Sequence, residues 1–103
     1  MDLKFEKYKQ EILQLSELLN IKINNLEGID CFLPFFTRIK EDSSILIIKL
    51  DGEREKNLFT LMISGNLLGQ GEYIRAETSD LEGGLSYIFV EYAKKVWQWE
   101  PLE

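Results

Sequence analysis

The chain has no histidine and one cysteine, Cys31, among its 103 residues. Histidine is the commonest general base near neutral pH and the commonest metal ligand. Its absence excludes Ser-His-Asp and Cys-His catalysis, zinc motifs built on paired histidines, and haem ligation by histidine. Cys31 lies in the apolar segment Ile-Asp-Cys-Phe-Leu, with no basic neighbour to activate it. We therefore expect a buried, inert thiol, and one free cysteine fits a reducing compartment.

Carboxylates are the remaining candidates for acid–base chemistry. Asp51, Glu53 and Glu55 form one cluster, and Asp80 and Glu82 form a second. Paired carboxylates can hydrolyse glycosidic bonds without histidine. Both clusters, however, fall in a predicted turn or at a predicted helix start, where solvated charges and helix caps account for them. The sequence does not single them out as catalytic.

Two short motifs approach known catalytic or phosphate-binding patterns without completing them. Residues 64–71 are rich in glycine, but no Lys-Ser or Lys-Thr pair follows, and the next predicted element is a strand instead of a helix. The segment Gly84-Leu85-Ser86-Tyr87 approaches a nucleophile elbow, yet Ile88 stands where the final glycine is needed and no histidine is available as base. We predict that the protein is not an enzyme and carries no cofactor or metal.

The charge balance limits the classes of partner. Eighteen acidic and twelve basic residues give a net charge of −6. Such a chain gains nothing from releasing counterions on DNA or RNA, and an anionic membrane surface repels it. The first nine residues lack the apolar stretch of a signal peptide, and no apolar run approaches a membrane span. We expect a cytoplasmic protein that binds neither nucleic acid nor membranes.

The acidic excess is concentrated around one predicted strand-to-helix junction in the C-terminal half of the chain. The carboxylates are those of Glu72, Glu77, Asp80 and Glu82, and Arg75 is the one basic residue among them in sequence. An acidic patch of this kind attracts basic protein surfaces and accelerates association, although it also serves simple solubility. Trp97 lies off the apolar stripe of its predicted helix, where an aromatic residue either anchors an interface or folds over the edge of the domain. The candidate partner-binding residues are Glu72, Tyr73, Glu77, Asp80, Glu82 and Trp97.

Apolar periodicity predicts the elements that position these residues. A 3.6-residue stripe predicts a helix over residues 3–20, with Asp2 as its N-cap and Asn20 near its end. Residues 45–50 are apolar on both faces, as in a central strand, and residues 58–64 and 72–78 follow as strands. Residues 35–40 are ambiguous and fit a further strand, since Pro34 suits a strand start.

A second helix is predicted in the C-terminal part of the chain. Ser79 and Glu82 fit a capping box, but Gly83 and Gly84 weaken the first turn, so Leu85 is an alternative start. The short connections between the strands favour antiparallel pairing. The sequence thus predicts a single α+β domain spanning residues 1–103. It is an antiparallel meander of three to four strands flanked by an N-terminal and a C-terminal helix.

A small acidic chain of about 100 residues, without catalytic residues and with this helix–meander–helix order, resembles the small immunity proteins of bacterial toxin–immunity pairs. These include the pairs of contact-dependent growth inhibition systems. The resemblance implies a cognate protein toxin, commonly a nuclease with a basic substrate-binding surface. It implies that an acidic patch covers that surface and neutralises the toxin.

An acidic adaptor or secretion chaperone is the alternative that the sequence leaves open. Such proteins also place helices around an antiparallel sheet, and they bind a partner protein as homodimers. The exposed apolar surface that they need would come from residues 31–36. The sequence leaves the oligomeric state open. That state would separate the two hypotheses, since the adaptor is expected to be a stable dimer on its own.

Overall fold

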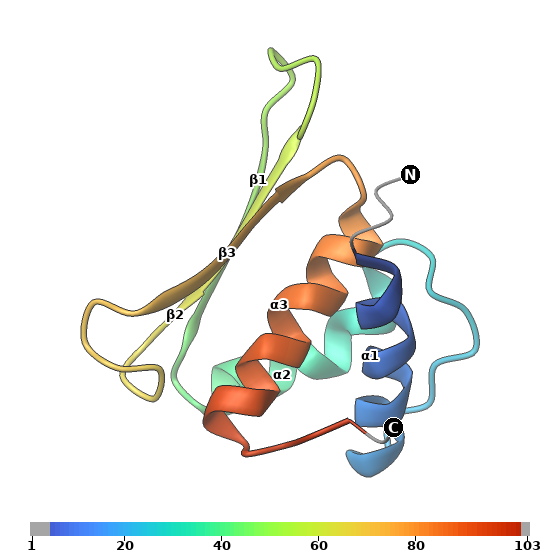
Figure 1. Ribbon diagram of the computed structural model, residues 1–103, viewed down its shortest axis with the longest axis vertical. Coiled ribbons are helices and arrows are strands. Elements are labelled where there is room, and N and C mark those ends of the chain that lie inside the picture. Colours follow the sequence, from blue (N-terminus) through green and yellow to red (C-terminus); the bar gives the residue numbers. More distant parts are fainter. Residues whose placement is uncertain (1–4, 102–103) are drawn as a thin grey trace.

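The computed structural model describes residues 5–101, which form one three-stranded antiparallel sheet with helices at both ends and one between (Figure 1). This arrangement confirms the α+β class and the meander. In chain order the elements are α1 (Glu6–Leu18), the 3-10 helix η2 (Asp30–Phe32), α2 (Leu33–Glu41), β1 (Ile45–Leu50), β2 (Phe59–Ser64), β3 (Tyr73–Thr78) and α3 (Leu81–Val96).

The middle strand of the sheet is β2, because the strand order is β1-β2-β3. Ile48 of β1 pairs with Leu61 of β2, and Leu61 pairs with Ala76 of β3. The prediction that residues 45–50 form the central strand is therefore wrong. Its apolar character on both faces does not arise from burial on both faces, since Ile45 and Ile47 are exposed.

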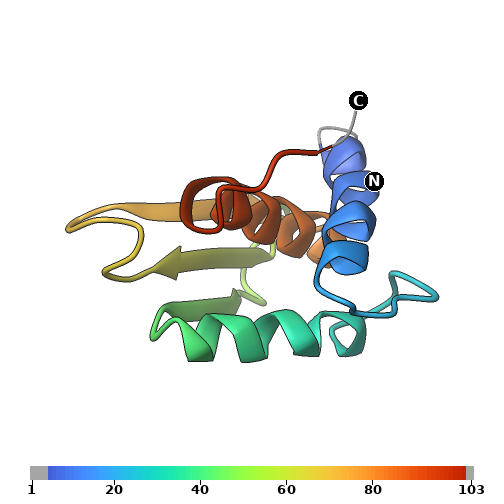
Figure 2. The same ribbon diagram turned by 90° about the horizontal axis from the view of Figure 1, so that it is seen from below.

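The helices gather on one side of the sheet. α3 packs on β2 and β3 and also on α1, so it lies between the sheet and α1, while α2 packs against β1 (Figures 1 and 2). Within residues 5–101 no helix covers the other side of the sheet. We call that side the open face. By register it carries Ile45, Ile47 and Lys49 of β1, Thr60, Met62 and Ser64 of β2, and Tyr73, Arg75 and Glu77 of β3.

Residues 35–40 belong to α2, so the suggestion of a further strand there is wrong. Pro34 lies in the first turn of this helix, where its missing N–H costs nothing. Phe35 and Ile39 are four residues apart and both buried, which is helical spacing. Ser43, with a φ of 58°, ends the helix, and Ser44 N–H donates to the Ile39 carbonyl.

The N-terminal helix is confirmed but is shorter than predicted, because α1 begins at Glu6 with Phe5 as its N-cap and Leu19 and Asn20 lie beyond its end. Asp2 and residues 3–4 lie outside the described residues, and α1 ends at Leu18. Asn20 has a φ of 58°, and Ile21 N–H donates to the Ser16 carbonyl, so the predicted stop is confirmed.

The C-terminal helix begins at Leu81, not at Leu85, and its N-cap is Asp80 instead of Ser79. Both Gly83 and Gly84 lie inside the helix. Asp80 Oδ1 accepts a hydrogen bond from Gly83 N–H at 3.0 Å, which satisfies an otherwise free donor of the first turn. Gly84 lies where α3 approaches the sheet closely. A Cβ on it would stand 2.5 Å from Leu61 Cδ1 and 2.8 Å from Thr78 Cγ2.

The hydrophobic core lies between the sheet and the helices. α3 contributes the largest share, with Leu85, Ile88 and Phe89 among its buried residues. Phe89 stacks with Phe32 and Phe35 at centroid distances of 6.1 and 5.3 Å, which joins α3 to η2 and α2. In the part of the chain that the structure describes, no helix is long and apolar enough to cross a lipid bilayer.

Candidate protein-binding site

The open face presents aliphatic and aromatic side chains to solvent. Ile45 is 56% exposed, Ile47 46% and Tyr73 55%. The register places Ile45 and Tyr73 in one row across Ser64, and Ile47 in the next row beside Met62. One half of the open face is therefore apolar, and an uncovered apolar patch on a sheet is typical of a protein-binding surface.

The other half of the open face is charged and internally paired. Glu77 Oε1 lies 3.0 Å from Arg75 Nη2 and 3.2 Å from Arg54 Nη1. The Arg54 side chain reaches there from the connection between β1 and β2, where its Nε also pairs with Asp51 at 3.2 Å. Arg75 is recognisable from the sequence as a neighbour of Glu77, but Arg54 is not, because only the fold of the β1–β2 connection brings Arg54 to Glu77. Glu77 is thus neutralised within the chain.

Asp80 and Glu82 hold the start of α3 in place. Asp80 caps the helix through Oδ1, and its Oδ2 lies 3.0 Å from Lys9 Nζ of α1. Burial acts to lower the pKa of Lys9, but the bond to Asp80 and the charges of Asp80 and Glu6 outweigh it and raise that pKa. Glu82 Oε2 accepts a hydrogen bond from Gly28 N–H at 2.7 Å, which ties the loop before η2 to α3.

The structure separates the predicted acidic residues. Glu72 and Tyr73 lie at the start of β3, whereas Asp80 and Glu82 lie beyond its end, with the whole strand between them. No ion pair among the described residues involves Glu72, which is exposed. Glu72 and Tyr73 are therefore the two predicted partner-binding residues that remain available at the rim of the open face.

Trp97 follows the last residue of α3 and does not belong to the open face. Its side chain has partners within the chain. Its Nε1 donates to Asp42 Oδ2 at 2.8 Å, and its ring meets Tyr92 edge-on at 5.3 Å. Tyr92 OH donates to the same Asp42 oxygen at 2.8 Å and also lies 2.8 Å from Ser44 Oγ. This network joins the end of α2 to the end of α3, so Trp97 has a structural role here.

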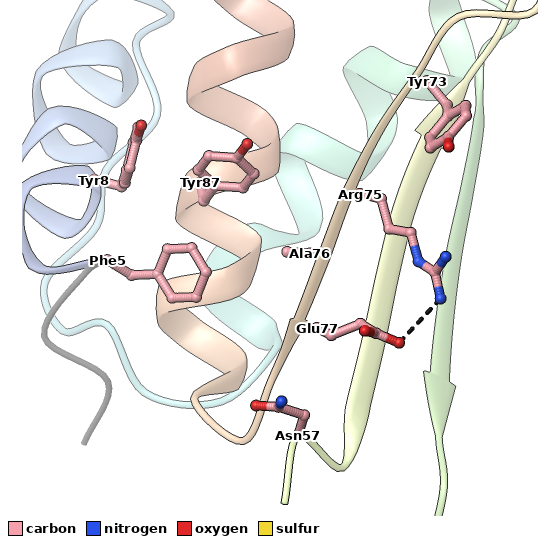
Figure 3. A pocket seen from close by; sticks show the side chains of 8 residues that line it. All are labelled: Phe5, Tyr8, Asn57, Tyr73, Arg75, Ala76, Glu77 and Tyr87. Carbon is pink, nitrogen blue, oxygen red and sulfur yellow. Dashed lines mark hydrogen bonds and ion pairs between the residues drawn. The ribbon is translucent and has the colours of Figure 1, made fainter.

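A pocket of about 690 Å³ lies along the outer edge of β3 (Figure 3). Phe5, Tyr8 and Tyr87 line it on the helix side, and residues of β3 line it opposite. Tyr8 meets Tyr87 edge-on at 4.9 Å, and Phe5 lies 5.4 Å from Tyr87. Burial and the nearby Glu91 carboxylate raise the pKa of Tyr8 and of Tyr87, so both phenols stay neutral at pH 7.

Neither the aromatic wall of this pocket nor the exposure of the isoleucines of β1 was predicted from the sequence. The apolar stripe of its helix assigns Tyr8 to the core, and Tyr87 carries no periodic signal of its own. The apolar run over residues 45–50 assigns Ile45 and Ile47 to a central strand. One signal in the sequence could have indicated that exposure. Residues 45, 47 and 49 point to the same side of a strand, and the third of them is the charged Lys49, which favours a solvent-facing side.

Cys31 is only partly buried, so the expectation of a buried thiol is wrong. Burial is still the largest influence on it, and it raises the pKa of the thiol, which favours the unreactive protonated form. Its Sγ lies 3.7 Å from the Gly28 carbonyl. Among residues 5–101 no group of three histidine, cysteine, aspartate or glutamate side chains is arranged to hold a metal ion.

Comparison with known proteins adds no relative. No family model matches the chain, and neither a curated protein nor a solved structure matches it. The open face and the pocket beside β3 are therefore the features that bear on function.

Proposed function

We propose that this protein is an inhibitor of the toxin–immunity type, which binds a cognate bacterial toxin through the open face of its sheet. The supporting observation is that Ile45, Ile47 and Tyr73 are exposed together on a face without a helical cover. Their apolar area stabilises a complex when a partner removes it from water. The net charge of −6 steers the protein to a basic toxin domain, such as a nuclease.

The apolar half of the open face carries the contact in this proposal, and the carboxylates have a lesser share. Glu77 is paired with two guanidinium groups, and Asp80 and Glu82 stabilise α3. Using these carboxylates to imitate phosphates would require breaking their internal bonds. Glu72, at the rim beside Tyr73, is the acidic residue best placed to meet a basic side chain of the toxin.

The adaptor or secretion chaperone hypothesis stays a prediction without a supporting observation. It needs residues 31–36 to expose apolar surface. Phe32 and Phe35 are instead buried in the core, and Leu33 is the large apolar residue of that segment that stands exposed. We therefore propose the inhibitor alone.

Co-expression tests the proposal in cells. The C-terminal region encoded by the reading frame next to this gene is expressed with and without the protein, and surviving cells are counted. We expect toxicity that the protein abolishes. Absence of toxicity, or toxicity that the protein does not relieve, would exclude a cognate pair with that neighbour.

Paired variants test the surface. The double variant Ile45→Lys with Ile47→Lys should lose protection, because two ammonium groups would occupy the proposed interface. Leu67→Lys is the matched control, since Leu67 is 55% exposed but lies in the connection between β2 and β3, outside the open face. Circular dichroism checks that both variants fold. If both protect equally, the contact lies elsewhere.

A further inference from the structure

The outer edge of β3 carries unpaired backbone groups. Asp51 N–H donates to the Leu58 carbonyl at 2.7 Å, which fixes which residues exchange hydrogen bonds in the two ladders. Following the strand registers from this pair, Ile74 and Ala76 direct their N–H and C=O groups toward β2. Tyr73, Arg75 and Glu77 therefore direct theirs outward, and no backbone group in residues 5–101 bonds to them there.

These outward groups border the pocket of about 690 Å³ described above. Tyr73, Arg75 and Glu77 all belong to its lining, together with Phe5 and Tyr87 (Figure 3). A strand placed beside β3 would bond these backbone groups and point alternate side chains toward the aromatic wall. An exposed strand edge with a pocket for side chains is the arrangement that strand addition uses.

The two edges of the sheet differ in their protection. α2 packs against β1, whereas no element lies outside β3 at the level of the sheet among the described residues (Figure 2). Covering an edge with a helix prevents pairing with another chain. The edge that remains competent for pairing is that of β3.

The sequence of β3 is complementary to itself in one antiparallel register. Two copies related by a two-fold axis perpendicular to the sheet keep their open faces on the same side. Odd-numbered residues of β3 must therefore pair with odd-numbered residues of the second copy, and even-numbered residues with even-numbered ones. With Ala76 opposite Ala76 of the second copy, each Arg75 lies opposite a Glu77, and each Ile74 lies opposite a Thr78. Opposite charges directly across a strand pair stabilise it. Because Arg75 and Glu77 are also paired within each chain, the two pairs of both copies would form one alternating network of charges, and no internal bond has to be given up.

We propose that the protein forms a homodimer in which β3 pairs with β3 of a second copy in this register. The dimer contains a six-stranded antiparallel sheet and joins two open faces into one surface twice as long. The aromatic walls formed by Phe5, Tyr8 and Tyr87 flank the new strand pair from both copies. This inference rests on the edge of β3 and not on the proposed function. A dimer by itself would favour the adaptor hypothesis, whereas protection in the co-expression experiment would favour the inhibitor.

Sedimentation of the full chain over a micromolar to millimolar concentration series tests the proposal. We expect the wild type to dimerise reversibly. Arg75→Glu places two glutamates opposite each other at both pairs, so its dimer dissociation constant should rise roughly tenfold or more. Lys49→Glu is the matched control, because it makes the same charge change on the same face at the β1 edge and should dimerise like the wild type.

A mixing experiment separates charge pairing from misfolding. Glu77→Arg alone should also impair self-association, since two arginines then face two arginines. An equimolar mixture of the Arg75→Glu and Glu77→Arg variants pairs glutamates with arginines, so it should form heterodimers with an affinity near that of the wild-type homodimer. Such rescue requires both variants to fold and requires this register.

Hydrogen exchange provides the residue-level readout. The N–H groups of Tyr73, Arg75 and Glu77 should exchange slowly at dimer-forming concentration and quickly after dilution. A wild type that remains monomeric at millimolar concentration overturns the proposal. So does a dimer that Arg75→Glu leaves intact, because that dimer uses another surface.

Discussion

At the scale of single residues, the fold decides which charges are free. The sequence places Glu72, Glu77, Asp80 and Glu82 within eleven positions, and counting them suggests one acidic patch. Three of the four have partners in the folded chain: Arg54 and Arg75 for Glu77, Lys9 for Asp80, and Gly28 N–H for Glu82. Arg54, Lys9 and Gly28 are distant in sequence from the carboxylates that they contact, so no local pattern reveals the three pairs that they form.

Asp80 gives the first prediction at this scale. Asp80→Ala removes the N-cap of α3 and the partner of Lys9, so we expect a loss of about 1–2 kcal/mol in the free energy of unfolding. Asp80→Asn keeps the capping oxygen and should lose less than the alanine variant. Urea denaturation of both variants measures this difference. Equal losses would show that the ion pair with Lys9, not the cap, carries the stabilisation.

Tyr92 gives the second prediction at this scale. Its hydroxyl bonds to Asp42 and Ser44, so Tyr92→Phe should lower the free energy of unfolding by about 1 kcal/mol, as measured by urea denaturation at pH 7. Burial is the largest influence on this phenol and raises its pKa to about 12 from 10 in the unfolded chain. The raised pKa favours the folded state fully below pH 10.

The difference in stability between the wild type and Tyr92→Phe should therefore be constant below pH 10 and shrink as the pH rises from 10 toward 12. Phenolate absorbance offers an independent check, because Tyr92 should still be protonated above pH 10, as its raised pKa of about 12 requires. Ionisation of all four tyrosines near pH 10 would contradict the hydrogen-bonded, buried state of Tyr92.

At the scale of elements, close packing sets residue identity where α3 crosses the sheet. Gly84 lies against Leu61 of β2 and Thr78 of β3, and a methyl group there has no space. A helix containing two adjacent glycines is a weak helix by propensity, and for this reason the sequence suggests a start at Leu85. Packing against the sheet and the Asp80 cap overcome that weakness and extend α3 to Leu81.

Gly84→Ala tests this contact. Alanine raises helix propensity, yet its Cβ would stand 2.5 Å from Leu61 Cδ1, so we expect a net destabilisation of about 1–3 kcal/mol. The control is Gly52→Ala, since a Cβ at Gly52 meets no atom within 4 Å. Thermal and urea unfolding compare the two. A stabilised Gly84→Ala variant would show that α3 stands further from the sheet.

At the scale of the whole molecule, the strand order distributes stability. β2 is paired on both sides and faces the core through Leu61 and Ile63, whereas β1 and β3 each have one unpaired edge. The helices cover one face and leave the other open, and the functional proposal depends on this asymmetry.

Native-state hydrogen exchange checks this order. We expect the N–H groups of Leu61 and Ile63 to be among the slowest in the sheet, since they lie in H-bonded pairs with β3. The N–H of Ile48 points away from β2 and should exchange faster by at least an order of magnitude. Ile48 protection equal to that of Leu61 would place β1 in the interior of the sheet instead.

The sequence alone determined the class of fold and the terminal helices, because those features depend on local periodicity and turn chemistry. The stripe of α1, the stop at Asn20 and the alternation of buried Ile74 and Ala76 in β3 were all predictable in this way. The absence of histidine likewise limits the chemistry of the chain, whichever fold it adopts.

Tertiary structure alone decided the strand order, the helical state of residues 33–41, and which charges remain free. A run such as residues 45–50 has the same apolar pattern whether its second face is buried by the chain or left for a partner. Local patterns reflect which side chains avoid water, but the packing of distant segments determines what covers them. The open face and the free edge of β3 exist because the helices all pack on one side of the sheet.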